Sequence, residues 1–252
     1  MTVIRDTHKE FEGRATNAMT FAGNYTADES SGHGTHVAGI IGGKTYGVAK
    51  QTMIIGVTVL DAEGNGTSSN LVAALQWVHD DALKHERASR SVVNMSLGVK
   101  GKSAALDDAI KALKESGILV VTAAGNDNAN TAEYTPANSP DAFTVGAVDS
   151  QNQRAPYSNW GPGVQIYAPG HSILSVGYEN DEAVVYRTGS SMACPHVAGL
   201  ASYFKGLYGL DDPNDVIQTI LKYAVNGTVG DPKGGYNAVA SNGQNKQIKF
   251  EL

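Results

Sequence analysis

The sequence has a single cysteine and no run of like charges, and each of these features excludes a class of function. Cys194 is the single cysteine of the 252-residue chain, so neither an internal disulfide nor a C-x-x-C metal or redox site can form. The formal charge of −6 is spread along the chain without basic runs, which argues against nucleic acid and against an anionic membrane as partners. No apolar run approaches the length of a membrane span, and the polar start MTVIRDTHKEFEGRA is not typical of a secretory signal peptide.

Linkers and repeats are also missing, while glycine is abundant. The chain carries no Pro/Ser-rich or low-complexity stretch and no internal repeat, and 41% of its residues are hydrophobic. Its 29 glycines fit a large core joined by tight turns. We therefore expect a single domain over residues 1–252.

Apolar strand-like runs alternate with helical patterns along the chain. The pattern predicts strands within 53–61, 91–98, 117–126, 142–149 and 164–170, of which 53–61 is expected to be buried because its apolar residues are nearly continuous. Helices are predicted over 68–85, capped by Ser68 or Ser69, and around 106–113, ended by Gly117. The predicted apolar face of the first helix is Leu71, Ala74, Leu75, Val78 and Ala82. This alternation predicts an α/β fold with a mostly parallel sheet and helices on both faces, whose site lies at the carboxyl ends of the strands.

Three glycine-flanked segments carry polar residues that could act together. The segments are SGHGTHVAGIIGG with His33 and His36, TAAGNDN with Asn126, and TGSSMACPHVAGL with Ser190, Ser191 and His196. A serine hydroxyl needs a base to take its proton, and imidazole suits that role near neutral pH. An oxyanion needs donors, which the backbone N–H of Ser191 at a helix start and the amide of Asn126 could supply. Taken singly these residues are ordinary caps and turn residues, but together they point to nucleophilic catalysis by serine.

With these three segments the chain resembles the subtilisin-like serine proteases (subtilases, peptidase S8), in particular their proteinase K-like branch. The resemblance extends to the segments EFEGRA, YGVAK, GVTVLD, NMSLG and YSNWGPGVQIYAPG. The resemblance implies a three-layer subtilisin-like fold and a serine endopeptidase that works through an acyl-enzyme. It implies that Ser191 is the nucleophile, His33 the general base and Asn126 the oxyanion donor. His36 and His196 match positions that are not catalytic in the family.

The resemblance also implies a groove for an extended peptide that binds as an added strand. Its expected edges and the walls of its main pocket are Asn65, Gly66, Thr67, Ser96, Leu97, Gly98, Ala123, Ala124 and Gly125, with Pro136 and Ala137 opposite. No charged side chain lines those walls. We therefore expect a preference for an apolar or aromatic residue before the scissile bond.

The sequence departs from the family pattern at the third catalytic group. The family has an aspartate in a D-T-G turn, and Met1 stands at that position here. Asp6 lies five residues beyond that position, and Asp28 and Glu29, just before His33, are expected to be solvated loop residues, so none of the three is expected to replace the aspartate. The resemblance implies that the signal peptide, the propeptide and the first core strand lie upstream of Met1, so we expect an N-terminally truncated domain with two unpaired strand edges beside a slot.

The remaining expectations concern cofactors, partners and location. No cofactor is required, and Gln165 replaces the aspartate of a family calcium site, where a neutral amide is a weaker ligand. Protein or peptide substrates and the chain's own propeptide are the expected partners of a monomer that binds neither nucleic acid nor membrane. The resemblance implies secretion or a vacuolar location. Two alternatives stay open. The first is a catalytically inactive subtilase-like protein that binds peptides, or a truncated fragment of such a protein. The second is an unrelated α/β binding module.

Overall fold

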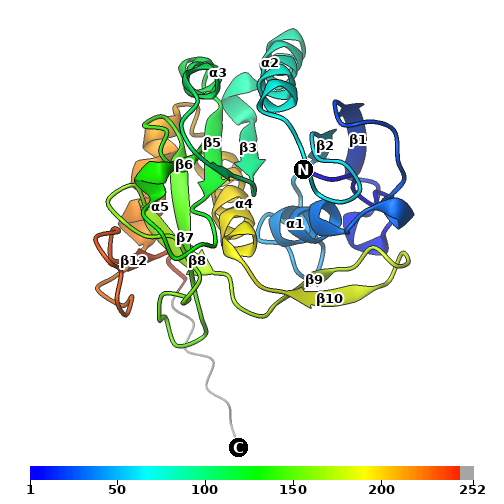
Figure 1. Cartoon of the computed structure of the whole chain (residues 1–252). Coiled ribbons are helices and arrows are strands. Elements are labelled where there is room, and N and C mark those ends of the chain that lie inside the picture. The colour runs from blue at the N-terminus through cyan, green and yellow to red at the C-terminus, as the bar shows by residue number, and fades with distance from the viewer. Residues whose placement is uncertain (245–252) are drawn as a thin grey trace, which may run out of the picture.

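The computed structural model describes residues 1–244 of the chain (Figure 1). Five α-helices are described in that range: α1 His33–Gly42, α2 Ser68–Lys84, α3 Ala104–Glu115, α4 Ser190–Tyr208 and α5 Pro213–Tyr223. The strands there are β1 Ala15–Thr20, β2 Ile54–Thr58, β3 Val92–Met95, β4 Val99–Lys100, β5 Leu119–Ala123, β6 Tyr134–Thr135, β7 Phe143–Val148, β8 Ile166–Pro169, β9 Ile173–Val176, β10 Val184–Arg187, β11 Val225–Asn226 and β12 Ala238–Val239. None of the helices within residues 1–244 combines the length and the apolar character needed to cross a membrane.

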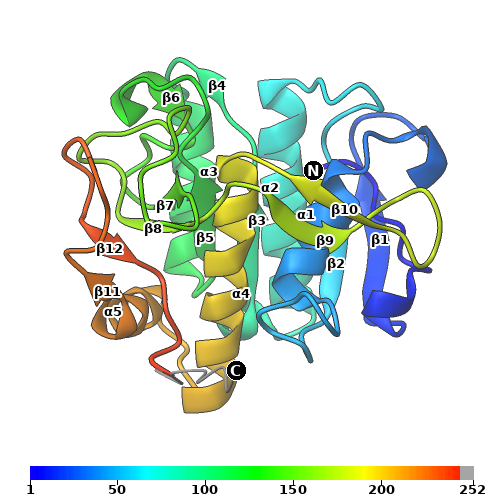
Figure 2. The ribbon, with the colours of Figure 1, turned by 90° about the horizontal axis from the view of Figure 1, so that it is seen from below.

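A six-stranded sheet forms the centre of the molecule, in the order β11-β12-β8-β7-β5-β3. Its pairs from β12 to β3 are parallel, and only the short β11 is antiparallel to its neighbour. Successive side chains of β5 enter different cores. Val121 packs in the cluster with α4 and α5, whereas Val120 packs in the cluster with α2 and α3. Helices therefore cover both faces of the sheet, as predicted (Figure 2).

Strands β1 and β2 form a separate parallel pair that is not part of the six-stranded sheet. A third cluster of buried residues, including Ala15, Ala38 and Ile54, holds this pair against α1. The pair is not hydrogen-bonded to β3, and a cavity of about 520 Å³ lies between β2 and β3. Among residues 1–244, β2 and β3 each have one edge without a strand partner beside this cavity.

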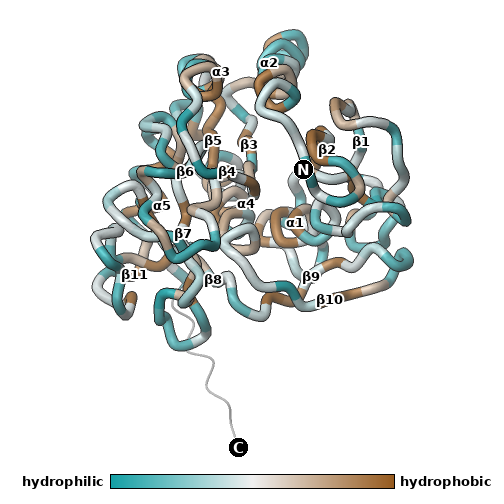
Figure 3. Tube along the Cα trace, in the orientation of Figure 1, coloured by the Kyte–Doolittle hydropathy of each residue, from teal (hydrophilic) through white to brown (hydrophobic). Residues whose placement is uncertain are grey.

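Two sequence predictions need correction. The N-cap of α2 is Thr67, whose hydroxyl accepts the N–H of Asn70 at 3.1 Å, rather than Ser68 or Ser69. The 53–61 segment forms a strand over Ile54–Thr58, but it is not fully buried, because Ile55 is 39% exposed. Both predictions used local pattern alone, and the exposure of Ile55 depends on what lies beside the strand. Figure 3 shows that hydrophobic residues otherwise follow the sheet strands and the helix sides turned toward them.

Candidate active site

Ser191 lies in the first turn of α4, next to the carboxyl end of β3. Its hydroxyl donates to the backbone carbonyl of Ser96 at 3.2 Å, and the Ser96 hydroxyl donates to the Ser191 carbonyl at 2.9 Å. This reciprocal pair fixes the start of the helix to the segment that follows β3. The sequence predicted Ser96 as a groove residue, whereas here its carbonyl and its hydroxyl both contact Ser191.

Two hydrogen bonds join Ser190 to the neighbouring residues Gly125 and Asn126, beside Ser191. The Ser190 N–H donates to Oδ1 of Asn126 at 2.8 Å, and the Gly125 N–H donates to the Ser190 hydroxyl at 3.1 Å. Oδ1 of Asn126 thus accepts a hydrogen bond from the protein itself. The amide nitrogen of Asn126 carries the donors of this side chain and is the atom that could donate to a substrate. Ser190 is buried and acts as the positioning residue for this loop.

The two predicted oxyanion donors converge at Gly189. A Cβ built on that glycine would lie 3.5 Å from Nδ2 of Asn126 and 3.7 Å from the backbone nitrogen of Ser191. Gly189 has a φ of 154°, a backbone conformation that L side chains rarely adopt, which explains a glycine at this position. The N-terminus of α4 adds a favourable dipole for negative charge at the same point.

His33 is the first residue of α1, and this helix packs against α4 (Figure 2). Val37 and Ile40 of α1 pack with Met192, the residue after Ser191, so the two helix starts lie close together. The pKa of His33 is lowered from 6.5 to about 4, mainly by burial and then by the positive charges of the Met1 α-amino group and of Arg187. A neutral imidazole able to accept a proton is therefore the stable form at neutral pH.

The other two histidines of these motifs are held by backbone groups. Nε2 of His36 lies 3.1 Å from the Ile173 carbonyl and 3.0 Å from the Val185 carbonyl, so it ties α1 to β9 and β10. Nδ1 of His196 lies 2.8 Å from the Met192 carbonyl in its own helix. Both contacts give these rings structural partners.

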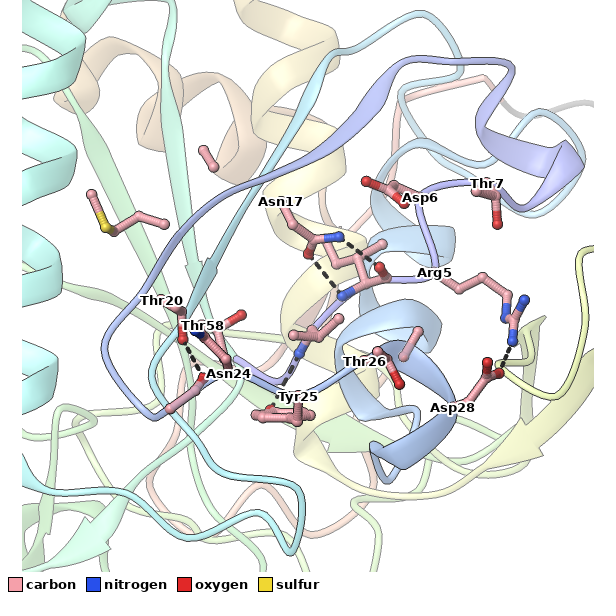
Figure 4. A pocket seen from close by; sticks show the side chains of 16 residues that line it. Arg5, Asp6, Thr7, Asn17, Thr20, Asn24, Tyr25, Thr26, Asp28 and Thr58 are labelled. Atoms are coloured by element: carbon pink, nitrogen blue, oxygen red, sulfur yellow. Dashed lines mark hydrogen bonds and ion pairs between the residues drawn. The ribbon is translucent and has the colours of Figure 1, made fainter.

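The nearby carboxylates are engaged elsewhere or lie apart. Asp28 forms an ion pair with Arg5, and Glu29 accepts from the backbone N–H of Thr26 at 2.7 Å. Figure 4 shows Asp6 and Asp28 in one polar pocket, where the dashed line from Arg5 leads to Asp28. Within residues 1–244, no hydrogen bond or ion pair joins a carboxylate to the His33 ring. Thr2 is instead the neighbour of this helix start, because its hydroxyl accepts the Gly34 N–H at 2.7 Å.

The predicted groove residues differ in exposure: some lie on exposed turns, whereas Ser96 is buried. Gly98 is exposed, and it precedes β4, which pairs antiparallel with β6. Asn65, Gly66 and Thr67 are exposed in the turn before α2, with the Asn65 N–H donating to Asp61 at 2.7 Å. Ala123 and Ala124 are buried below Gly125, which takes a left-handed φ of 103°.

Gln165 does not present its side chain to a cation site in this structure. Its Oε1 accepts the N–H of Thr144 at 2.9 Å, and its own N–H donates to the Thr144 carbonyl at 3.0 Å. The amide oxygen is thus already bonded, and the residues present do not fit the family's calcium site. Among residues 1–244, no cluster of three or more His, Cys, Asp or Glu side chains could hold a metal ion.

A serine at a helix start, an amide and a backbone N–H near it, and a neutral imidazole on a helix packed against the serine's helix are the groups that a serine hydrolase uses. The Subtilase family (Peptidase_S8) model matches residues 4–247, and the chain belongs to this family. The resemblance read from the motifs is therefore confirmed.

Similar proteins agree with this assignment. The chain is 46% identical to "Subtilisin-like protease 3" of Pseudogymnoascus destructans over 237 residues, 93% of this chain and 58% of that protein. It is 44% identical to "Alkaline protease 1" of Aspergillus clavatus, covering 94% of this chain and 58% of that protein. The crystal structure of a cold adapted subtilisin-like serine proteinase matches with a TM-score of 0.86 and 38% identity, covering 94% of this chain and 85% of that one. The chain thus spans a little over half the length of the first two relatives.

Proposed function

We propose that the chain hydrolyses peptide bonds as a serine endopeptidase of the acyl-enzyme type. The observation that carries this proposal is the convergence of Nδ2 of Asn126 and the backbone nitrogen of Ser191 on one point beside the nucleophile. Donors placed where negative charge develops are commonly the largest single contribution to such catalysis.

Each step uses a residue already described. The Ser191 hydroxyl rotates from the Ser96 carbonyl, gives its proton to His33 and attacks the substrate carbonyl. The oxyanion is held by Asn126 and the Ser191 N–H, and His33 returns the proton to the leaving amine. Water then gives a proton to His33 and attacks the acyl carbon, the bond to the Ser191 oxygen breaks, and His33 returns the proton to that oxygen as the acid product leaves.

The substrate would be an extended peptide with an apolar residue before the scissile bond. The exposed segments at Asn65–Thr67 and at Gly98 support binding of a strand between them. The buried alanines 123 and 124 support an uncharged pocket. By family resemblance we also propose a secreted or vacuolar monomer that is inhibited by its own propeptide and does not depend on calcium at Gln165.

The third catalytic group limits the expected rate. Position 1 carries a methionine, and the side-chain charge that acts on His33 is that of Arg187, so the imidazolium formed during acylation lacks an opposing charge. In subtilisin, a relative, loss of the carboxylate alone lowers kcat by roughly 10⁴. We therefore propose slow turnover for the chain with Met1.

The test uses a fluorophosphonate probe, peptide-amide hydrolysis and two matched serine variants. Ser191→Ala should abolish labelling and lower turnover to background, whereas Ser190→Ala should keep labelling at a reduced rate, because it loosens the Asn126 loop without removing the nucleophile. Circular dichroism checks the fold of both. Equal losses in the two variants would contradict the assignment of Ser191.

A second arm replaces Met1 by Asp or by Asn, each behind a single initiating methionine. The Asp variant should raise turnover by about 10³-fold or more, and the Asn variant, which is nearly the same size but neutral, should not. If the unaltered chain binds peptides but neither labels nor turns over in any form, the alternative of an inactive peptide-binding subtilase holds.

A further inference from the structure

Arg187 is the last residue of β10 and lies beside both catalytic residues. It precedes the nucleophile Ser191 by four positions, and its Nη2 donates to the carbonyl of Ser31, two positions before His33. Burial is the main cause of the lowered pKa of His33 and of His36, and the charge of Arg187 contributes to both shifts. Figure 2 shows β10 next to α1, with the chain passing from it to the start of α4.

The charge of Arg187 has no counterpart in the described part of the chain. Within residues 1–244, no carboxylate forms an ion pair with Arg187, and its buried Nε has no hydrogen-bond partner. The acids of the β9-β10 turn and of the loop before α1 are held by other groups. These acids are Asp28 and Asp181, which pair with Arg5, Glu182, which pairs with Lys9, and Glu179, which accepts the Tyr178 N–H at 3.0 Å.

A half-buried guanidinium in this state favours an anion from outside the chain. Arg187 has lost part of its hydration, and a charge that is partly removed from water is costly unless it is paired. Its planar group offers parallel N–H donors that match the two oxygens of a carboxylate. The ligand chemistry that fits Arg187 is therefore a carboxylate.

The proposed reaction places the leaving part of the peptide on the side of Arg187. Ser96, which leads to the groove edge at Gly98, contacts Ser191 from β3, whereas Arg187 belongs to β10 in another sheet. His33 gives its proton to the leaving amine, so the residue that carries this amine faces His33. Because Arg187 is bonded to the segment just before His33, the residues after the scissile bond come within its reach.

We propose that Arg187 is a specificity-determining residue that binds the carboxylate of an Asp or Glu side chain at the first or second position after the scissile bond. The proposal rests on the proposed hydrolysis for the direction of the peptide. The pocket expected before the scissile bond is walled by the uncharged Ala123 and Ala124. The two ends of the groove therefore select different chemistry, an apolar side chain before the cleaved bond and an acidic one after it.

The test compares peptides that differ by one charge. The two series are Ac-Ala-Ala-Ala-Phe-Xaa-Ala-Ala-NH2 and Ac-Ala-Ala-Ala-Phe-Ala-Xaa-Ala-NH2, where Xaa is Glu or its neutral isostere Gln. Liquid chromatography gives kcat/KM for cleavage after Phe. At low salt, the Glu peptide should be cleaved roughly three- to tenfold faster than the Gln peptide in at least one series. The ratio should fall when NaCl is added, because salt screens a partly exposed ion pair.

Three variants show whether Arg187 causes this ratio. Arg187→Gln should bring the Glu/Gln ratio to about one, and Arg187→Lys should keep part of it, because the charge remains but the planar donors do not. Lys100→Gln, which removes the same charge from β4, should leave the ratio unchanged. An equal loss for both peptides in Arg187→Gln, with an unchanged ratio, would show that Arg187 only holds the Ser31 segment, and would overturn the proposal. A ratio near one in the unaltered chain would overturn it as well.

Peptide binding to Ser191→Ala separates this proposal from the proposed hydrolysis. This variant lacks the nucleophile but keeps Arg187, so calorimetry should give a Kd that is lower for the Glu peptide than for the Gln peptide by a similar factor. Adding Arg187→Gln should remove the difference. Such a difference in a chain that never turns over would support the role of Arg187 and contradict hydrolysis. Turnover with equal rates and equal Kd values for Glu and Gln peptides would contradict the role of Arg187 alone.

Discussion

Strands β5 and β2 are both parallel strands with apolar sequences, yet they lie in different environments. Every residue of β5 is buried, and it pairs with β3 on one side and β7 on the other. In β2, Ile55 is 39% exposed, and only β1 pairs along its whole length. The sequences of the two strands, LVVTA and IIGVT, do not predict this difference in burial. Burial of a parallel strand therefore depends on its neighbours in the sheet as much as on its own residues.

The helices above the two regions show the same contrast. In α3, which lies over the closed part of the sheet, Leu106, Ile110 and Leu113 are all buried. In the 17-residue α2, beside the cavity, the buried residues are Ala74, Leu75 and Ala82, while Leu71 and Val78 are only half-buried. The apolar face of α2 was predicted from the sequence, but unlike that of α3 it is only partly covered.

The largest expected effect comes from the same truncation in the two regions. Leu119→Ala in β5 should lower the free energy of unfolding by about 3–4 kcal/mol, because it leaves a hole in a closed core. Ile55→Ala in β2 should cost less than about 1 kcal/mol, because its side chain already faces solvent in part. Urea unfolding of both variants checks this, and similar costs would mean that the cavity is closed in solution.

Acid should act first on the region that holds β2. Burial lowers the pKa of His36 from 6.5 to about 4, so the unfolded chain binds a proton there that the folded chain does not. The free energy of unfolding then falls as pH drops from 6.5 toward 4, by up to roughly 3 kcal/mol for this group. His33, lowered to about 4, adds to the same trend.

The corresponding variant is His36→Gln, which can keep an N–H toward the Ile173 and Val185 carbonyls but does not titrate. It should flatten the decline of Tm between pH 6.5 and 4.5, while His85→Gln on the exposed end of α2 should not. Hydrogen exchange at pH 4.5 should quicken in β1-β2 before β5-β7. The opposite order would contradict the contrast between the two regions.

The smallest effect is expected from chelation. Because the Gln165 amide oxygen is bonded to Thr144, EDTA should shift Tm by less than about 2 °C. Differential scanning fluorimetry with and without EDTA measures this, with Gln165→Ala as the comparison. A drop of several degrees that Gln165→Ala removes would show a cation bound in the closed region.

The sequence predicted the class of fold and the main elements, because long apolar runs and helical periodicity depend on local chemistry. The motifs also placed Ser191, Asn126 and His33 on elements that meet at one edge. What local pattern could not supply was contact between distant segments, such as the mutual hydrogen bonds of Ser96 and Ser191 across 95 positions of the chain. Thr67 rather than Ser68 as the cap of α2 was missed because three neighbouring hydroxyl residues are all suitable caps.

The paired hydrogen bonds between Ser96 and Ser191 have a mechanical consequence. Ser96 directly follows β3, the strand with one free edge, so the nucleophile is anchored to the border of the incomplete sheet. A sideways shift of β3 by a fraction of an ångström would carry the Ser96 carbonyl with it and turn the Ser191 hydroxyl relative to His33. The rigidity of the β3 edge thus determines how firmly the Ser191 hydroxyl is held in its orientation toward His33.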